Sequence, residues 1–416
     1  MTASLPKDEL SPITLPEIDA ARRVLSGSVI RTPLVEAKSL SDQTGANLLL
    51  KLENLQVTGS FKARGALVRL LALDDASRRT GVVAVSAGNH AQGVAWHARR
   101  LNIPATIVMP KSTPFTKVER TESMGATVVL WGDSLDEALA HAGMLVAERR
   151  LTLIHPYDDR LIMAGQASIG AEILEDASTI DMLVVPVGGG GLIAGIVSCV
   201  KAVRPEIVVI GVQVEGYSPL ARHGASTPAP QRQTLAEGIA VKHPGLRSRA
   251  IMDCLVDDVV AVSELSIEQA VEALLEKQKQ VVEGAGAAPL AAVMADPSRF
   301  AGHTVGLVIS GGNIDNRLLS SLLMRGLVRD GRLARLRIEI SDAPGTLAKV
   351  GALIGDGGGN ILEVHHQRLF QDIPVKYAEL DVAVEARDAP HLHAMIESLC
   401  KAGFPTRLLG SRAGTE

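Results

Sequence analysis

Short aliphatic runs alternate with longer amphipathic segments through the first 330 residues of the chain. The runs are almost unbroken in hydrophobic character, which is typical of strands that are buried on both faces of a sheet. They lie at residues 82–85, 105–109, 126–130, 182–185, 208–212 and 305–309. Segments of helical length, such as 91–100 and 267–282, lie between them. The pattern predicts the α/β fold class, with parallel sheets and right-handed crossovers.

The pattern changes after Arg332. An alternating strand, a helix and two extended runs are followed by a second helix and a last short strand, in the order βαββαβ. These elements are expected at residues 336–340, 347–354, 360–369, 375–384, 389–401 and 406–409. We therefore expect two domains, at residues 1–330 and 334–416, with a smaller subdomain of about residues 50–150 inserted in the first. The segment 325–335, rich in arginine and glycine, is the predicted linker, with a solvated helix end as the alternative.

Polar and glycine-rich motifs follow three of the predicted buried strands. Ser86 comes after the run at 82–85, Gly188 after the run that begins at Met182, and Ser310 after the run at 305–309. In parallel sheets, ligands bind at the carboxyl ends of the strands. The sequence therefore predicts that these three strand ends converge on one crevice.

The residue types in these motifs suit one cofactor. Lys62 offers an amine that can form an imine with an aldehyde, and Ser310 offers a hydroxyl that can bond a pyridine nitrogen. The run Gly188-Gly189-Gly190-Gly191 offers backbone N–H donors for a phosphate, ahead of a predicted helix from Leu192 onward. A lone lysine is usually a surface charge and a glycine pair usually a turn, but together these parts predict a site for pyridoxal phosphate.

Composition excludes several other classes. The 416 residues carry a net charge of −4 without a long basic run, so nucleic acid is not an expected partner. The three cysteines are far apart and indicate neither disulfides nor a metal site, which favours a reducing cytoplasm. The N-terminus does not resemble a signal peptide. The uncharged stretch from Met182 to Val200 is interrupted by Pro186 and four glycines, which favours a strand, a loop and a buried helix over a membrane span.

Four motifs in this order resemble the threonine dehydratases (threonine ammonia-lyases), which are fold-type II pyridoxal phosphate enzymes with two parallel-sheet subdomains. The resemblance runs from about residue 15 to residue 330. It is carried by the motifs at residues 53–66, 86–93, 186–192 and 310–313. The C-terminal region resembles an ACT domain, a βαββαβ ferredoxin-like fold, through its Asp342, Pro344, Gly345 and Leu347.

The resemblance implies roles for individual residues. Lys62 would hold the cofactor covalently and act as the catalytic base on the substrate Cα. The implied cofactor-binding residues are Phe61, Lys62, Asn89, Gly188, Gly189, Gly190, Gly191, Leu192, Glu283 and Ser310. The implied substrate-binding residues are Ser86, Ala87, Gly88, Asn89 and His90, and no metal is expected.

Four of these positions have alternative roles or consequences for the reaction. Asn89 could instead cap the helix that follows it, and Glu283 could be a carboxylate at a helix end. Ser310 is a neutral partner for the pyridine nitrogen, which suits elimination better than transamination. Related racemases carry a serine where this chain has Ala87, and alanine cannot transfer a proton, so racemisation is disfavoured.

The resemblance implies deamination of L-threonine to 2-oxobutyrate and ammonia, with L-serine as a second substrate. One alternative is a dehydratase for serine or 3-hydroxyaspartate, since one methyl group is discriminated by only about 1–3 kcal/mol. Another is an amino-acid-sensing protein whose ACT-like domain binds an effector. The resemblance implies isoleucine as this effector, because 2-oxobutyrate is a precursor in isoleucine biosynthesis. A homo-oligomer, either dimer or tetramer, is expected, with no membrane partner.

Overall fold

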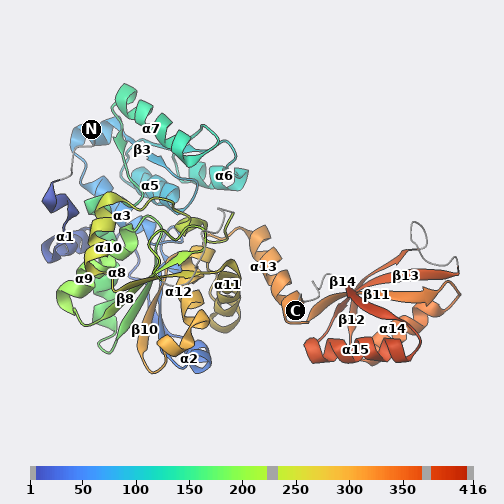
Figure 1. Ribbon diagram of the computed structural model, residues 1–416. Helices are drawn as coiled ribbons and strands as arrows, with labels where there is room; N and C mark the ends of the chain where they lie inside the picture. Colours follow the sequence, from blue (N-terminus) through green and yellow to red (C-terminus); the bar gives the residue numbers. More distant parts are fainter. Residues whose placement is uncertain (1–5, 223–232, 368–375, 410–416) are drawn as a thin grey trace. The chain divides into compact units, whose positions relative to one another are not determined.

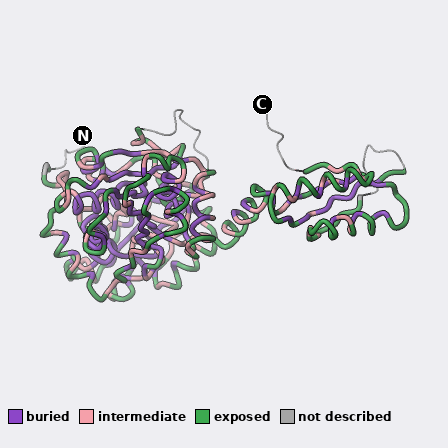
Figure 2. The backbone as a smooth tube through the Cα atoms, turned by 90° about the horizontal axis from the view of Figure 1, so that it is seen from below, coloured by how far each residue is buried: buried purple, intermediate pink, exposed green. Residues whose placement is uncertain are grey.

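The computed structural model describes residues 6–222, 233–367 and 376–409, and the chain divides into two compact units after Ile314 (Figure 1). Buried backbone is concentrated in the centre of the first unit (Figure 2). None of the helices in these described ranges is long and apolar enough to cross a membrane.

The main sheet of the first unit has six strands. Their order is β1 (Leu34–Glu36), β2 (Asn47–Leu52), β10 (Thr304–Ile309), β7 (Met182–Pro186), β8 (Val208–Val214) and β9 (Asp258–Val262). All neighbours are parallel except β1, which pairs with β2 in the antiparallel direction. The pairing of β2 with β10 places the segment before Lys62 beside the strand that leads to Ser310.

A second, smaller parallel sheet lies in the same unit. Its order is β5 (Thr127–Leu130), β4 (Ala105–Met109), β3 (Val82–Val85) and β6 (Thr152–Leu153). Together the two sheets confirm the predicted α/β class, and the six predicted runs form strands with small differences at their ends. The expectation of burial on both faces is wrong for the run at 126–130, because β5 is an edge strand whose Thr127 and Leu130 are exposed.

Helices connect and cover both sheets (Figure 1). They are η1 Lys7–Leu10, α1 Leu15–Leu25, α2 Lys38–Thr44, η2 Glu53–Leu55, α3 Lys62–Leu71, α4 Asp75–Thr80, α5 Asn89–Arg100, α6 Phe115–Ser123, α7 Leu135–Arg149, α8 Arg160–Asp176, α9 Gly191–Val203, η3 Glu237–Ile239, α10 Leu246–Leu255, α11 Glu264–Gln278, α12 Gly284–Ala295 and η4 Pro297–Arg299.

One of two longer predicted stretches forms as expected, and the other ends earlier than predicted. The stretch from Met182 to Val200 forms β7, the glycine loop and the buried helix α9, as predicted. The helix predicted at 267–282 is α11, which ends at Gln278 because Lys279 adopts a left-handed conformation with φ 56°. A left-handed residue terminates a helix by capping its last carbonyls.

The second unit begins with α13 (Asn316–Arg329). It continues with β11 (Leu333–Ser341), α14 (Thr346–Asp356), β12 (Asn360–Gln367), β13 (Tyr377–Glu385), α15 (Ala389–Lys401) and β14 (Thr406–Leu409). The antiparallel sheet has the order β12-β13-β11-β14, so the βαββαβ prediction is confirmed. Residues 368–369 and 375, at the ends of two predicted strands, lie outside the described residues.

The predicted linker at 325–335 is wrong for most of its length. Helix α13 continues through Arg329 and β11 begins at Leu333, so only residues 330–332 lie between them. The helix persists because it buries Leu322 and Gly326 on one face, which gives this arginine-rich segment an apolar contact.

A buried ionic cluster anchors α3, the helix that begins at Lys62. Arg64 is fully buried and donates two hydrogen bonds to Glu53, at 2.8 and 2.9 Å, and two to Glu172, at 2.6 and 2.9 Å. Lys51 adds a bond of 2.6 Å to Glu172. Burial alone would raise the pKa of Glu53, but the Arg64 guanidinium holds that pKa below its usual value. These charges pair with one another inside the core, so removal of Arg64 would leave the buried Glu53 without its ion-pair partner.

Arg64→Met should therefore lower the free energy of unfolding by about 3–5 kcal/mol, the usual cost of breaking a buried ion pair from one side. Urea unfolding at pH 7 measures the change. Lys38→Met is the matched control, because it removes a solvent-exposed pair with Asp42, at 3.3 Å, and should leave the stability unchanged within error. A loss at Arg64 no larger than the loss at Lys38 would contradict the anchoring role.

Candidate active site

A short piece of antiparallel pairing joins the Lys62 loop to the Ser310 loop. Ser60 and Gly311 form an isolated bridge. On either side of it, the N–H of Phe61 donates to the Ser310 carbonyl at 3.1 Å and the N–H of Gly312 donates to the Gly59 carbonyl at 2.9 Å. The structure thus brings together two of the predicted site residues that are far apart in the sequence.

Lys62 lies at the first position of α3 and is only partly exposed to solvent. Its Nζ donates a hydrogen bond of 2.6 Å to the Pro156 carbonyl and lies 5.1 Å from the centre of the Phe61 ring. Burial lowers the pKa of Lys62 to about 8, although the nearby Glu283 carboxylate acts in the opposite direction. A substantial fraction of this amine is therefore neutral near physiological pH, as a nucleophile or a base requires.

The four glycines form the loop between β7 and α9. All four are buried, and Gly190 has a left-handed backbone with φ 93°. A Cβ atom at Gly189 would lie 2.2 Å from the Tyr157 ring, and one at Gly191 would lie 2.6 Å from the Tyr157 carbonyl oxygen. No side chain fits at these two positions without movement of the neighbours.

The glycine loop leaves its donors free. In the described part of the chain, the backbone N–H groups of Gly188, Gly189 and Gly190 form no hydrogen bond. The loop opens directly into α9, whose first turn includes the buried Leu192 and whose positive end faces the loop. Unpaired donors at a helix N-terminus fit the phosphate of pyridoxal phosphate.

Asn89 and Glu283 are brought together by their side chains. Asn89 Nδ2 donates to Glu283 Oε1 at 2.7 Å, and no side-chain cap is made at the start of α5, whose N-cap residue is Gly88. The alternative reading of Asn89 as a helix cap is therefore wrong. Burial raises the pKa of Glu283 to about 7, against the Asn89 hydrogen bond, which lowers it.

Ser310 and the loop after β3 occupy the expected strand ends. Ser310 is 3% exposed at the end of β10, and Ser86 follows β3, where its hydroxyl accepts a bond of 3.1 Å from the Gly88 N–H. Ala87 is partly buried against the core of the smaller sheet. These residues lie where the sequence analysis expected them, at the carboxyl ends of parallel strands.

His90 is engaged inside the protein rather than directed at solvent. Its Nε2 lies 2.9 Å from the Ile154 carbonyl, and its ring is buried. Burial lowers the pKa of His90 to about 3, and the charge of Lys62 acts in the same direction. The ring is therefore neutral, and its Nε2 is already engaged by the Ile154 carbonyl.

The segment around Tyr157 was missed by the sequence analysis. The Tyr157 ring lies against the glycine loop, and its hydroxyl donates to the His243 carbonyl at 3.3 Å. The adjacent Asp158 carboxylate accepts from the backbone of Arg247 and Ser248 at the start of α10, at 2.9 and 3.1 Å. Ser248 Oγ in turn donates to the Gly189 carbonyl at 2.6 Å. This segment connects Lys62, through Pro156, to the loop, and no local pattern in the sequence indicated it.

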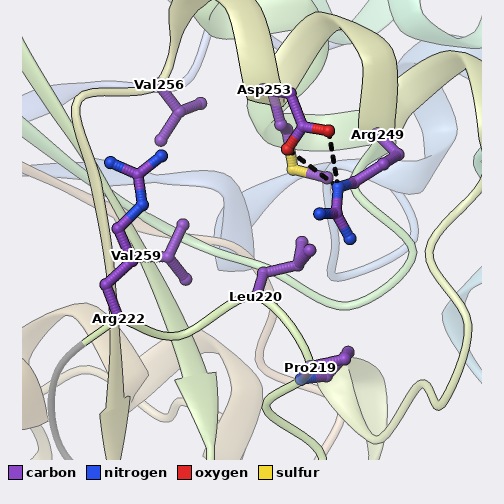
Figure 3. Close-up of a pocket in the computed structure, with 8 residues that line it drawn as sticks. Pro219, Leu220, Arg222, Arg249, Asp253, Val256 and Val259 are labelled. Carbon is purple, nitrogen blue, oxygen red and sulfur yellow. Dashed lines mark hydrogen bonds and ion pairs between the residues drawn. The ribbon is translucent and has the colours of Figure 1, made fainter.

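A surface hollow of about 240 Å³ lies elsewhere in the first unit (Figure 3). It is lined by Pro219, Leu220, Arg222, Arg249, Met252, Asp253, Val256 and Val259. The Arg249 and Asp253 side chains at its rim pair with each other at 2.8 Å. None of its lining residues belongs to the predicted site.

Gly189→Ala should weaken binding of pyridoxal phosphate about 5- to 100-fold, because the added methyl group overlaps the Tyr157 ring and overpacking costs about 1–3 kcal/mol. Fluorescence titration of the cofactor-free protein measures the change. Gly143→Ala in α7 is the control, since nothing lies within 4 Å of a Cβ atom there. Equal affinities for the two variants would contradict a tightly fitted loop.

Covalent capture of pyridoxal phosphate by the cofactor-free protein should accelerate with pH through about 8, because only the neutral Lys62 amine reacts. Between about pH 8 and 10.5 the unfolded chain still binds this proton while the folded chain does not. The free energy of unfolding therefore rises with pH through that window. Glu283→Gln removes the charge that favours the ammonium form and should move the midpoint of capture to lower pH. A midpoint near 10.5, or an upward shift in the variant, would rule out this arrangement.

Comparison with known proteins independently supports a pyridoxal phosphate enzyme. Residues 25–311 match the family described as pyridoxal-phosphate dependent enzyme. The L-threonine ammonia-lyase of Thermotoga maritima is 41% identical over 401 residues, which cover 96% of this chain and 100% of that protein. The structure of the processed form of threonine deaminase isoform 2 from Solanum lycopersicum is 33% identical, with a TM-score of 0.68, over 74% of this chain and 91% of that one. Maize serine racemase is 32% identical, with a TM-score of 0.70, over 77% of this chain and 99% of that one. The chain therefore belongs to the family of pyridoxal-phosphate dependent enzymes, together with the L-threonine ammonia-lyase of Thermotoga maritima.

Proposed function

We propose that this protein converts L-threonine to 2-oxobutyrate and ammonia, with pyridoxal phosphate as its cofactor. The observation that carries the proposal is the joining of Lys62 to Ser310 by the Ser60–Gly311 bridge, in a chain 41% identical to an L-threonine ammonia-lyase. The conversion removes one ammonia and balances without a further reactant. L-Serine, which differs by one methyl group, is the expected second substrate.

Each residue of the site has a defined task in this reaction. When bound, pyridoxal phosphate supplies an aldehyde for the amino group and a ring that withdraws electrons from the substrate Cα. Lys62 holds the cofactor and then, as a neutral amine, removes the Cα proton. The glycine loop holds the phosphate with its unpaired N–H donors, and the loop from Ser86 to His90 receives the substrate carboxylate.

Ser310 favours elimination over other reactions of the same cofactor. A hydroxyl opposite the pyridine nitrogen does not keep that nitrogen protonated, whereas a carboxylate would. With a weaker electron sink, negative charge at Cα is best relieved by loss of the β-hydroxyl group. Transamination is therefore disfavoured.

Racemisation is the main competing reaction, because maize serine racemase is 32% identical to this chain. A racemase needs an acid or base on each face of the substrate Cα, and the position at which related racemases carry serine is Ala87 here. A methyl group transfers no proton. This difference favours the lyase, although serine and 3-hydroxyaspartate stay in view as alternative substrates for dehydration.

In our proposal, one part of the chain carries out catalysis and the other part regulates it. Residues 1–330 form the catalytic part, with its smaller subdomain at about 50–150, and residues 334–416 form a regulatory ACT-like part. Isoleucine is the effector that we propose, bound near the turn before α14, where Gly345 is left-handed with φ 85°. Calorimetric titration with isoleucine and with valine separates an effector site from a purely structural role. The homo-oligomer and the cytoplasmic location expected from the sequence stay predictions.

Lys62→Ala should abolish covalent capture of the cofactor and lower threonine turnover by at least about 10²- to 10⁴-fold, the usual contribution of a positioned base. Absorbance of the bound cofactor and release of 2-oxobutyrate measure the two losses. Parallel assays with serine and 3-hydroxyaspartate rank the substrates, and threonine is expected to be turned over fastest. A Lys62→Ala protein that still deaminates threonine would refute the assignment.

A further inference from the structure

A row of hydrogen bonds leads from the surface of the smaller subdomain to Glu283. Arg120, in α6, donates from Nη2 to Asn313 Oδ1 at 2.8 Å. Asn313 Nδ2 donates to Asn89 Oδ1 at 2.7 Å, and Asn89 Nδ2 donates to Glu283 Oε1 at 2.7 Å. The row therefore joins two sequence-predicted cofactor residues to an arginine that no motif indicated.

The chemistry of the two ends fixes the direction of every bond. A guanidinium group can only donate, so Asn313 must present its oxygen to Arg120. The Asn313 amide group is then turned toward Asn89, and it also donates to the Thr58 carbonyl at 2.8 Å. Asn89 must accept with its oxygen and donate with its nitrogen, which is the arrangement that a carboxylate at Glu283 requires.

This direction determines what Asn89 can offer a ligand. One of its two N–H groups bonds Glu283, and the other has no partner among the described residues. With the amide held in this orientation, Asn89 presents a donor to the cofactor. In the reversed orientation, its oxygen would face Glu283, and the two acceptors would repel each other once Glu283 is ionised, above its pKa of about 7.

We propose that Arg120 is a positioning residue, which sets the orientation of the Asn89 amide through Asn313 and so determines which group of Asn89 faces the cofactor. The proposal rests on the proposed function only in taking pyridoxal phosphate as the ligand. Because Arg120 lies on α6 and Asn313 follows β10, the row also makes this orientation depend on the contact between the smaller subdomain and the main sheet.

The ion pair of Lys117 with Glu237 provides a control for the effect of Arg120. Lys117, one turn earlier in α6, pairs with Glu237 of η3 at 2.6 Å. It joins the same helix to the rest of the first unit with a similar charge, but it makes no bond to either asparagine. If Arg120 served only to hold α6 in place, loss of Lys117 and loss of Arg120 would have similar effects.

The test is titration of the cofactor-free protein with pyridoxal phosphate, read by affinity and by the visible absorbance maximum of the bound cofactor. Arg120→Lys keeps a donor and should stay within about twofold of the parent protein. Arg120→Met should weaken binding about two- to tenfold and shift the absorbance maximum. Arg120→Glu should weaken it further, because glutamate only accepts and forces Asn313 to turn around.

Asn313→Asp distinguishes a role in orienting the Asn89 amide from a role in holding α6 against residue 313. Aspartate still accepts from Arg120 as an ion pair, so a purely structural clamp would survive. It offers Asn89 a second acceptor, however, so Asn89 must reverse and its oxygen meets Glu283. We expect weaker binding and a shifted absorbance maximum, together with a lower melting temperature, because the aspartate no longer donates to the Thr58 carbonyl.

Lys117→Met is the control and should bind the cofactor within about twofold of the parent protein. The proposal is overturned if Asn313→Asp binds with the parent's affinity and absorbance maximum, or if Lys117→Met matches Arg120→Met. If the parent protein itself fails to capture pyridoxal phosphate, the proposed function fails instead, which is a different result. Circular dichroism identifies a misfolded variant, and the Arg120 series still decides the question if Asn313→Asp does not fold.

Discussion

The pairing of Ser60 with Gly311 is the contact on which the rest of the site depends. Two backbone hydrogen bonds around it fix the Lys62 loop to the Ser310 loop, because both partners are main-chain groups whose positions do not vary with rotamer. Beneath this contact, Arg64 is held by Glu53 and Glu172 in the core. The backbone of the helix that begins at Lys62 is therefore fixed at its first turn.

Burial also shifts the pKa values of Lys62 and Glu283 so that the neutral form of each group is favoured. Burial lowers the pKa of Lys62 and raises the pKa of Glu283, and each group partly stabilises the charged form of the other. Such opposed shifts in one crevice are typical of groups that exchange protons during a reaction. Stable salt bridges elsewhere in the unit, such as that of Arg160 with Glu17 at 2.6 Å, instead lower the carboxylate pKa, to about 2.

Steric fit governs the glycine loop. Tyr157 and α10 press on the glycine loop from both sides, so the loop can contain no Cβ atoms at its tightest points. The run of four glycines is thus explained by packing as well as by the need for free backbone donors. Aromatic residues make up only 2% of the chain, so most packing in the core is between aliphatic side chains, and the contact of Tyr157 with the loop is an exception.

The sequence by itself determined the α/β class, the positions of six strands of the first unit and the βαββαβ order of the second unit, because these depend on local periodicity. It did not determine that Asn89 bonds Glu283 rather than capping α5, that α13 continues through Arg329, or that Tyr157 and Arg120 belong to the surroundings of the site. Those facts depend on which segments meet in space. Contacts such as Arg120 with Asn313 join residues from different subdomains, and no pattern within one segment encodes a partner that only the packing of the sheets brings near.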